Sequence, residues 1–317
     1  MPAHHQVASN LDVLQHRAQL MKRIREFMAQ RNILEVDTPV LNSAGVTDPN
    51  IGNLSTEPGQ LDRGAVMYLG TSPEFYMKRL LAEGCGPIYQ LCKVFRDDPA
   101  ARLHQPEFTM LEWYRPGFDH MELMGEIDEL LYCLGIPGSE KYEYRETFLS
   151  QLQIDPFTCS IEELSGCALA SGFNDDSAGR DILLDYLFSH RVIQGLGTDK
   201  PFFIYHYPAS QAALAKISNS TPAYAERFEL FYRGMELANG FHELTDAAEQ
   251  RERFEKENRE RVSRGEAEIT IDQLLLEALE KGLPACAGVA VGVDRLLMTM
   301  LDKQHIKDVM SFPIVQE

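Results

Sequence analysis

The segment 95–114 constrains the fold more than any other part of this chain. An apolar run that ends at Arg96 predicts a strand, and a short polar loop then leads into a second strand. The second strand carries Glu112 and Tyr114, and side chains two residues apart on a strand project from the same face. We therefore expect Glu112 and Tyr114 to line one pocket, with Arg96 and His104 on the loop above it. Such a pocket suits a ligand that is anionic at one end and cationic at the other.

The order of the predicted elements indicates an antiparallel sheet with helices around it, which is the α+β class. The densely charged segment 246–265 predicts a solvated surface helix. Helices are also expected at 16–31, from Ser72-Pro73 to about 84, and at 120–134 and 271–281. Strands are expected at 33–39, 66–71, 88–95, 202–207, 228–232, 235–241 and 287–293. The expected organisation is a flexible N-terminus at 1–15 and one domain at 16–317, with a less regular helical insertion at about 137–200.

The charge balance and the cysteines limit the class of protein. Lys and Arg number 30 against 48 Asp and Glu, a net charge of −18, which argues against extensive nucleic-acid binding. The six cysteines form no CxxC pair, so buried thiols in a reducing compartment are expected. Residues 1–15 lack the regions of a signal peptide, and the run 282–293 is too short to cross a bilayer. These features predict a soluble, cytoplasmic protein without membrane attachment.

A bound nucleotide would have to be held by side chains, because the sequence contains neither GxxxxGK[ST] nor GxGxxG. Arg96 and Arg295 are the candidates, since a guanidinium offers a planar fork of donors that fits phosphate oxygens. An isolated arginine more often closes a surface ion pair. The position of both residues at strand ends beside polar loops favours the phosphate interpretation.

Two carboxylates are candidates for a divalent ion. Glu229 and Glu236 flank an expected tight turn at Arg233-Gly234, so they would lie on neighbouring strands. Two carboxylates with substrate phosphates are a common way to hold magnesium. Two solvated strand carboxylates explain the spacing equally well.

Further carboxylates point to a cationic ligand. Asn239, Phe241 and Glu243 share one face if their segment is extended. With Glu74 and Glu112 the pocket would then collect an excess of negative charge, which is costly unless a cation is present. We expect a ligand with an amine, and more specifically a diamine. Lys78 and Arg79 could form a basic docking patch, or could equally be solvated helix charges.

Several segments resemble the catalytic domain of class II aminoacyl-tRNA synthetases, and the lysyl enzymes in particular. Leu34-Glu35-Val36-Asp37-Thr38-Pro39 is similar to the first class II motif, which makes a dimer interface. Segment 95–114 resembles the second motif, and Gly288-Val289-Ala290-Val291-Gly292-Val293-Asp294-Arg295 the third. Residues 236–246 resemble the lysine-site segment. The resemblance runs from about His16 to the C-terminus and is weak only at 137–200.

Two features differ from the lysyl enzymes. The chain starts almost at the catalytic helix, so we expect their N-terminal anticodon-binding barrel to be absent, and Ala290 replaces a glycine. Both features are similar to those of the branch of the family that ligates (R)-β-lysine to elongation factor P. Three segments are also similar to that branch: Thr71-Ser72-Pro73-Glu74, 86–92 and 108–116. The resemblance implies an ATP-dependent, AMP-forming ligase that uses Mg²⁺, acts on a lysine ε-amine of elongation factor P and forms a homodimer. One alternative is a free-standing enzyme that aminoacylates a tRNA or a small amine, and another is an inactive dimerisation or regulatory module.

The resemblance also implies roles for single residues. Arg96 and Arg295 would be catalytic and bind the α-phosphate and the far end of the triphosphate, and Phe108 would stack on adenine. Asp98 and Gln105 replace the usual glutamate and asparagine, which puts their ATP contacts in doubt. Further ATP contacts are implied for Asp97, Asp98, His104, Gln105, Glu236, Leu237 and Gly292, and Mg²⁺ would be bound by Glu229 and Glu236. The β-lysine site would comprise Ser72, Pro73, Glu74, Glu112, Tyr114, Asn239, Phe241, Glu243 and Ala290.

Overall fold

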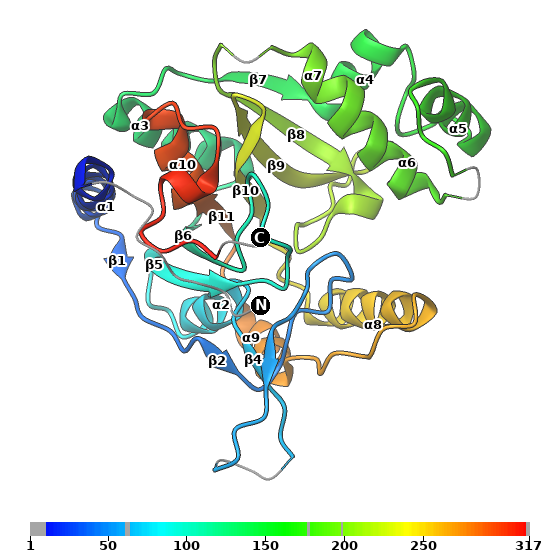
Figure 1. Cartoon of the computed structure of the whole chain (residues 1–317). Coiled ribbons are helices and arrows are strands. Elements are labelled where there is room, and N and C mark those ends of the chain that lie inside the picture. Colours follow the sequence, from blue (N-terminus) through cyan, green and yellow to red (C-terminus); the bar gives the residue numbers. More distant parts are fainter. Residues whose placement is uncertain (1–10, 61–63, 176–177, 198, 315–317) are drawn as a thin grey trace.

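An eight-stranded sheet crosses the centre of the molecule (Figure 1), in the order β1-β5-β6-β11-β10-β9-β8-β7. The structure is a computed structural model that describes residues 11–60, 64–175, 178–197 and 199–314. The outer pairs β1–β5 and β7–β8 are parallel, and every pair between them is antiparallel. The strands are β1 (Leu34–Glu35), β5 (Ile88–Phe95), β6 (Glu107–Pro116), β7 (Glu140–Glu143), β8 (Phe202–Pro208), β9 (Tyr224–Tyr232), β10 (Met235–His242) and β11 (Cys286–Gly292). The predicted α+β class is confirmed.

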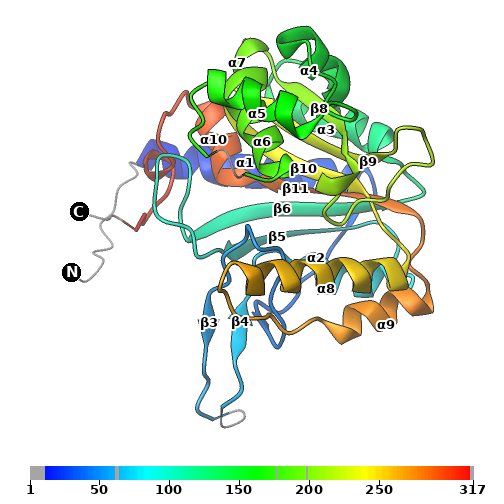
Figure 2. The ribbon, with the colours of Figure 1, turned by 90° about the vertical axis from the view of Figure 1, so that its right-hand side faces the viewer.

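Three helices cover one face of this sheet: α1 (Leu11–Gln30), α3 (His120–Leu134) and α10 (Val293–Met300) (Figure 2). Their apolar stripes pack on the strand residues that point to this side, such as Leu111, Trp113 and Phe228. Helix α3 starts at a capping box made by Asp119 and Glu122, which fixes its first turn. This face therefore forms the main hydrophobic core.

The opposite face carries two separate groups of helices. Near β5 and β6 lie α2 (Glu74–Ala82), α8 (Ala247–Ser263) and α9 (Gln273–Gly282), packed around Met77, Ile88 and Phe254. On β8 and β9 lie α4 (Tyr144–Leu152), α5 (Ile161–Ala170), α6 (Arg180–Leu187) and α7 (Ile193–Gly195), with a π-helical turn at Phe188–Val192. The sheet between the two groups is left uncovered by helices (Figure 1). Polar strand residues such as Glu112 and Asn239 face this strip.

A small second sheet flanks the open strip. It consists of β2 (Leu41–Asn42), β4 (Met67–Leu69) and β3 (Ser55–Thr56), in that order. The loop between β2 and β3 folds back toward α8, and Arg261 on that helix donates a hydrogen bond to the carbonyl of Asp48 (3.2 Å). The loop thus forms one wall of the open strip.

Several element boundaries differ from the sequence-based expectations. Helix α1 starts at Leu11, so residues 11–15 are helical rather than flexible; residues 1–10 of the expected flexible N-terminus lie outside the described residues. The strand expected at 33–39 is regular only at Leu34–Glu35. Helix α8 is less solvated than its charge indicates, because Phe254, Asn258 and Arg261 are buried. No helix in the described ranges combines the length and apolarity needed to cross a membrane.

Candidate active site

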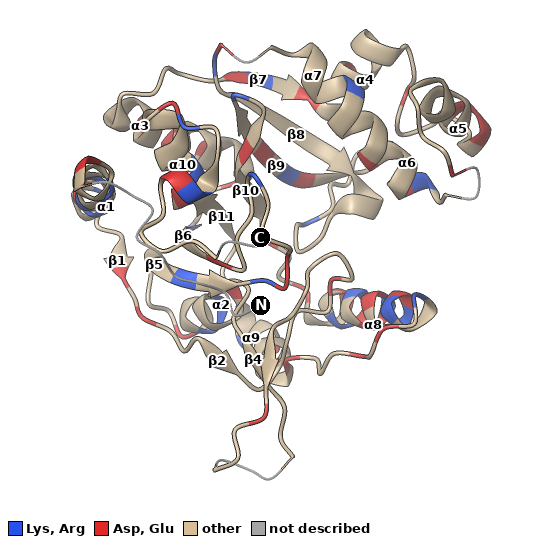
Figure 3. Cartoon of the chain, viewed as in Figure 1, with Lys and Arg blue, Asp and Glu red and all other residues tan. Residues whose placement is uncertain are grey.

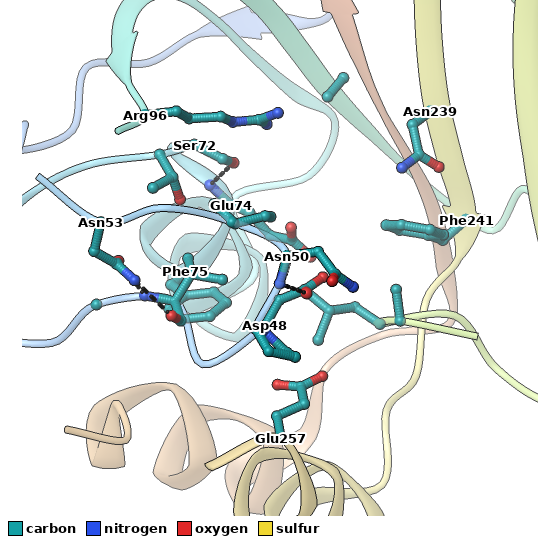
Figure 4. Close-up of a pocket in the computed structure, with 18 of the residues that line it drawn as sticks. Asp48, Asn50, Asn53, Ser72, Glu74, Phe75, Arg96, Asn239, Phe241 and Glu257 are labelled. Carbon is teal, nitrogen blue, oxygen red and sulfur yellow. Dashed lines mark hydrogen bonds between the residues drawn. The ribbon is translucent and has the colours of Figure 1, made fainter. Parts of the chain in front are cut away.

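A cavity of about 870 Å³ opens on the strip between the two helix groups. It is lined by fifteen of the residues singled out from the sequence: Ser72, Glu74, Arg96, Asp98, His104, Gln105, Phe108, Glu112, Glu236, Leu237, Asn239, Phe241, Ala290, Gly292 and Arg295. Arg96 lies across the cavity from Asn239 and Phe241, and Glu257 of α8 lies below them (Figure 4). The structure therefore brings most of the sequence-predicted site into one place.

A row of residues crosses five strands beneath the cavity, and its middle members Glu112, Ala290 and Asn239 line the cavity floor. Gln90, Glu112, Ala290, Asn239 and Glu229 are direct partners in the register of β5, β6, β11, β10 and β9. Directly opposed residues project from the same face of a sheet. The floor is consequently assembled from single side chains contributed by different strands.

Glu112 is held at the buried end of the cavity by two hydroxyl groups. Tyr114 donates to Oε1 and Ser72 donates to Oε2, each at 2.7 Å. Burial, together with the nearby Glu74 carboxylate, raises the pKa of Glu112 to about 8. The predicted common face of Glu112 and Tyr114 is confirmed, although Tyr114 supports Glu112 from behind rather than lining the cavity.

Lys78 is the important residue that sequence reasoning missed. It is buried on α2, with its Nζ 2.7 Å from Glu74 and 2.6 Å from Glu243. Burial opposes the charged form, but the carboxylates of Glu243 and Glu74 outweigh this and raise the pKa of Lys78. The idea of a basic surface patch or solvated charge at Lys78 is wrong. The spacing of Glu74 and Lys78, one helical turn apart, was the available signal.

Glu74, Lys78, Glu112 and Glu243 form what we call the acidic end. If all four are ionised, their sum is minus two, because one ammonium balances one of three carboxylates. Gly288 leaves the room for this packing, since a Cβ there would lie 2.3 Å from Tyr114 Cε1 and 2.5 Å from Glu243 Oε1. Glu243 is buried behind Lys78 and acts through it rather than as part of the cavity wall.

Arg96, His104, Glu236 and Arg295 form what we call the arginine end. The Arg96 guanidinium lies 5.3 Å from the centre of the Phe108 ring, and its buried Nε has no hydrogen-bond partner in the described part of the chain. Burial lowers the pKa of Arg96. A buried, unsatisfied guanidinium donor beside an aromatic face requires a polar partner such as a phosphate.

Arg295 is held in place by three neutral groups on two segments, strand β10 and the loop before β6. It donates to the carbonyl oxygens of Glu236 (2.9 Å) and Leu103 (3.3 Å), and to Nε2 of His104 (3.0 Å). Burial and the Arg295 charge lower the pKa of His104, which keeps the imidazole neutral as an acceptor. The Glu236 carboxylate is 3.9 Å from Nη1 of Arg295. Because these partners are mostly uncharged, much of the positive charge remains available to a ligand.

A β-bulge decides which way Glu236 points. Glu236 pairs with Phe231 and Ala238 pairs with Leu230, so Leu237 is an extra residue in β10. Without it, Glu236 and Asn239 would project from opposite faces. The bulge places both on the cavity side, where Glu229 also projects.

Glu229 and Glu236 therefore share a face, but their environments differ. Glu229 is buried, pairs with Arg227 and accepts a hydrogen bond from Tyr207 (2.8 Å), and it does not line the cavity. The side chain of Glu236 is 43% exposed. Hard carboxylate oxygens on one face fit Mg²⁺. Glu236 is accessible from the cavity, whereas Glu229 is already paired with Arg227.

Two further predicted residues, Asp97 and Pro73, lie apart from the cavity, and a third, Gln105, is hydrogen-bonded to the backbone. Asp97 turns away, with its backbone N–H donating to Gly52 (3.0 Å), and Pro73 is buried at the start of α2. Gln105 lines the cavity but exchanges two hydrogen bonds with the backbone of Ile314, at 2.8 and 3.2 Å. Its amide is thus committed to the C-terminal segment.

Charged residues of both signs line the cavity, among them Glu252, Arg253 and Lys256 of α8, the helix that carries both colours in Figure 3. Asp48 and Asn50 from the β2–β3 loop, Asp185 of α6 and Glu257 of α8 line it. Burial raises the pKa of Glu257 to about 7. These residues come from segments far apart in the sequence, and no motif marked them.

The fold and site define the class of protein. The family model described as tRNA synthetases class II (D, K and N) matches residues 5–316, and the chain belongs to this family. Among the curated proteins, two relatives from Salmonella typhi and Pseudoalteromonas translucida (strain TAC 125) are each 48% identical over 316 residues, covering 98% of this chain and 97% of the relative. Both are named elongation factor P–(R)-β-lysine ligase.

Proposed function

We propose that this protein is an ATP-dependent, AMP-forming ligase that activates (R)-β-lysine as an adenylate and transfers it to the ε-amine of a lysine of elongation factor P. The observation that carries the proposal is the pairing of a buried acidic end with an arginine end in one cavity. That layout matches a substrate with ammonium groups at one end and a carboxylate that must meet ATP at the other. The near full-length identity to two ligases with this name supports the choice of substrates.

In the first step the substrate carboxylate attacks the α-phosphorus of ATP, and pyrophosphate leaves with the bonding pair. A carboxylate is already ionised, so no general base is needed. Arg96 would neutralise the α-phosphate and Arg295 the far end of the triphosphate, and Phe108 would stack on adenine. Bound Mg²⁺, held by Glu236 with Glu229, would neutralise phosphate charge. Catalysis then rests on positioning and charge stabilisation.

The acidic end would bind the ammonium groups of the substrate. Glu112 and Glu74 face the cavity, and an ammonium group between them would offset their repulsion. Lys78 limits the excess of carboxylates, so the site suits a substrate that brings two positive charges. Ala290 and Asn239 lie beside Glu112 on the floor and would contact the carbon chain that separates amine from carboxylate.

In the second step an acceptor lysine amine attacks the adenylate carbonyl carbon. The C–N bond forms, the bond from carbonyl carbon to phosphate oxygen breaks, and AMP leaves with the electron pair. The acceptor's ordinary pKa is about 10.4, so it must lose a proton first. We propose that desolvation at the cavity mouth lowers its pKa. An amidation rate that keeps rising until the pH reaches about 10.4 would count against a lowered pKa of the acceptor amine.

The decisive experiment supplies the protein with ATP, Mg²⁺ and (R)-β-lysine, together with either elongation factor P or total tRNA. Intact-mass analysis should show one β-lysyl addition on the protein acceptor and none on the RNA. Acylation of tRNA with no protein product would favour the free-standing aminoacylating enzyme. No pyrophosphate exchange with any lysine isomer would instead favour the inactive module.

We further propose that the protein acts as a cytoplasmic homodimer. All six cysteines are free, which suits a reducing compartment. Leu34 and Val40 are apolar side chains exposed around the segment that resembles the dimer motif, at 56% and 38%. Sedimentation equilibrium tests the dimer, and charge substitution at Leu34 should shift it toward monomer.

A further inference from the structure

A second polar cluster lies on the opposite face of the sheet from the cavity. His120 begins α3, His206 lies on β8, Glu226 on β9 and His242 at the end of β10. One donor atom from each of His120, Glu226 and His242 lies within 4.8 Å of the other two. Nitrogen and oxygen donors that converge from separate elements are the usual composition of a transition-metal site.

His206 lies beside these three residues and contacts His120. Its Nε2 is 3.0 Å from Nε2 of His120, and its Nδ1 is 3.1 Å from a carboxylate oxygen of Glu143. A carboxylate on one ring nitrogen fixes the proton there and leaves a lone pair on the other. This carboxylate–histidine arrangement typically orients a metal ligand.

The backbone at His206 has a strained conformation that turns its side chain toward His120. His206 has φ +61°, and the register of β8 with β9 shifts between Tyr205 and Tyr207. In a regular strand residue 206 would share a face with Ile204, which packs under the α4–α7 helices. The bulge turns the imidazole to His120 instead. Strain at a non-glycine residue is maintained where it holds a functional group in place.

His120 itself is under-satisfied. The residue is buried, and its Nδ1 has no hydrogen-bond partner in the described part of the chain. His242 Nδ1 contacts Glu226. The cluster therefore contains more hydrogen-bond acceptor atoms than it has N–H groups to donate to them.

We propose that His120, His206, Glu226 and His242 bind a divalent transition metal, with Zn²⁺ as the best-suited ion. Imidazole and carboxylate ligands match the preferences of zinc. Because His242 lies between Phe241 and Glu243, the ion would fix the strand end directly behind the acidic end of the cavity. The site is separate from the carboxylates assigned to Mg²⁺.

The test begins with full-length protein dialysed against a chelator and returned to saturating Mg²⁺, which occupies the carboxylates of the cavity. Titration with Zn²⁺, and with Co²⁺ for its visible absorption, should show one ion per chain. His120→Ala should lose this ion, whereas His305→Ala, at an exposed histidine outside the cluster, should bind as the unchanged protein does.

Glu143→Gln keeps the four ligands and should weaken the metal about 10- to 100-fold, even if His120→Ala fails to fold. Zn²⁺ should also raise the Tm of the unchanged protein and of His305→Ala. Absence of stoichiometric binding would overturn the proposal. So would binding that survives in both His120→Ala and Glu143→Gln, or that is lost in Glu236→Gln instead.

Discussion

The acidic end and the arginine end of the cavity handle charge in different ways. At the acidic end the charged groups are buried and bonded to one another through Lys78, Ser72 and Tyr114. At the arginine end, Arg295 is held by carbonyls and a neutral imidazole, and Arg96 keeps an unsatisfied Nε. The first end makes most of its contacts within the chain and keeps an excess of carboxylates, whereas the second keeps donors that have no partner among the described residues. Substitutions at the acidic end should therefore affect stability, and those at the arginine end should affect chemistry.

The largest effect on stability is expected for Lys78→Met. Removal of the ammonium leaves the Glu74 and Glu243 carboxylates close together and uncompensated in a buried site. Loss of one partner of a buried ion pair typically costs about 3–5 kcal/mol in the free energy of unfolding. Urea unfolding measures it. Lys281→Met is the matched control, because its pair with Glu83 is exposed (2.5 Å) and should contribute at most about 1 kcal/mol. Equal losses of unfolding free energy in Lys78→Met and Lys281→Met would contradict the buried ion-pair role of Lys78.

Arg96→Ala should have the opposite effect, a large loss of activity with little loss of stability. We expect pyrophosphate exchange to fall about 10²–10³-fold, since a preorganised donor to developing charge is removed. The free energy of unfolding should change little, because Arg96 has no close carboxylate partner among the described residues. Arg102→Ala, at an exposed arginine on the same loop, should leave exchange intact. A large loss of stability in Arg96→Ala without loss of exchange would contradict the assignment.

Glu112→Gln tests the acidic end through pH. The pKa of Glu112 rises from 4.5 to about 8 on folding. Between these values the folded chain holds a proton that the unfolded chain has lost, so this group makes stability fall as pH rises, by at most about 1.4 kcal/mol per pH unit. The variant should lack this slope when urea unfolding is compared from pH 5 to 8. Glu107→Gln, at an exposed site on the same strand, should retain it.

The smallest effect is expected for Ala290→Gly. The Ala290 methyl lies between Glu112 and Asn239 on the cavity floor, so its removal changes the space beside the substrate chain. A methyl group in a pocket discriminates by roughly tenfold. We expect the ratio of exchange rates with β-lysine and α-lysine to shift by about that factor while stability changes little. An unchanged ratio would show that the methyl does not set the isomer preference.

Local patterns were enough to predict part of the site. Strand alternation correctly paired Glu112 with Tyr114 and placed Asn239 and Phe241 on one face. Arg96 was identified from its position after an apolar strand. The α+β class followed from the order of elements. All of these depend on residues that are near one another in the sequence.

The remaining features depend on contacts between distant segments. The bulge at Leu237, which turns Glu236 into the cavity, is defined only by pairing with β9. Burial of Lys78 requires Glu243, which is far along the chain. The histidine cluster joins α3 to three strands, and nothing in its spacing indicates convergence. Hydrophobic patterns of period 2 or 3.6 describe one strand or one helix, so they do not predict contacts between segments that are far apart in the sequence.

The row Gln90–Glu112–Ala290–Asn239–Glu229 has a consequence for how such enzymes change over time. Each position is fixed by the backbone hydrogen bonds of its own strand, so a new side chain at one position leaves the next backbone in place. Substrate preference can therefore evolve through single substitutions, one strand at a time. The backbone that holds Arg96 and Arg295 at the other end of the cavity stays in place during such steps.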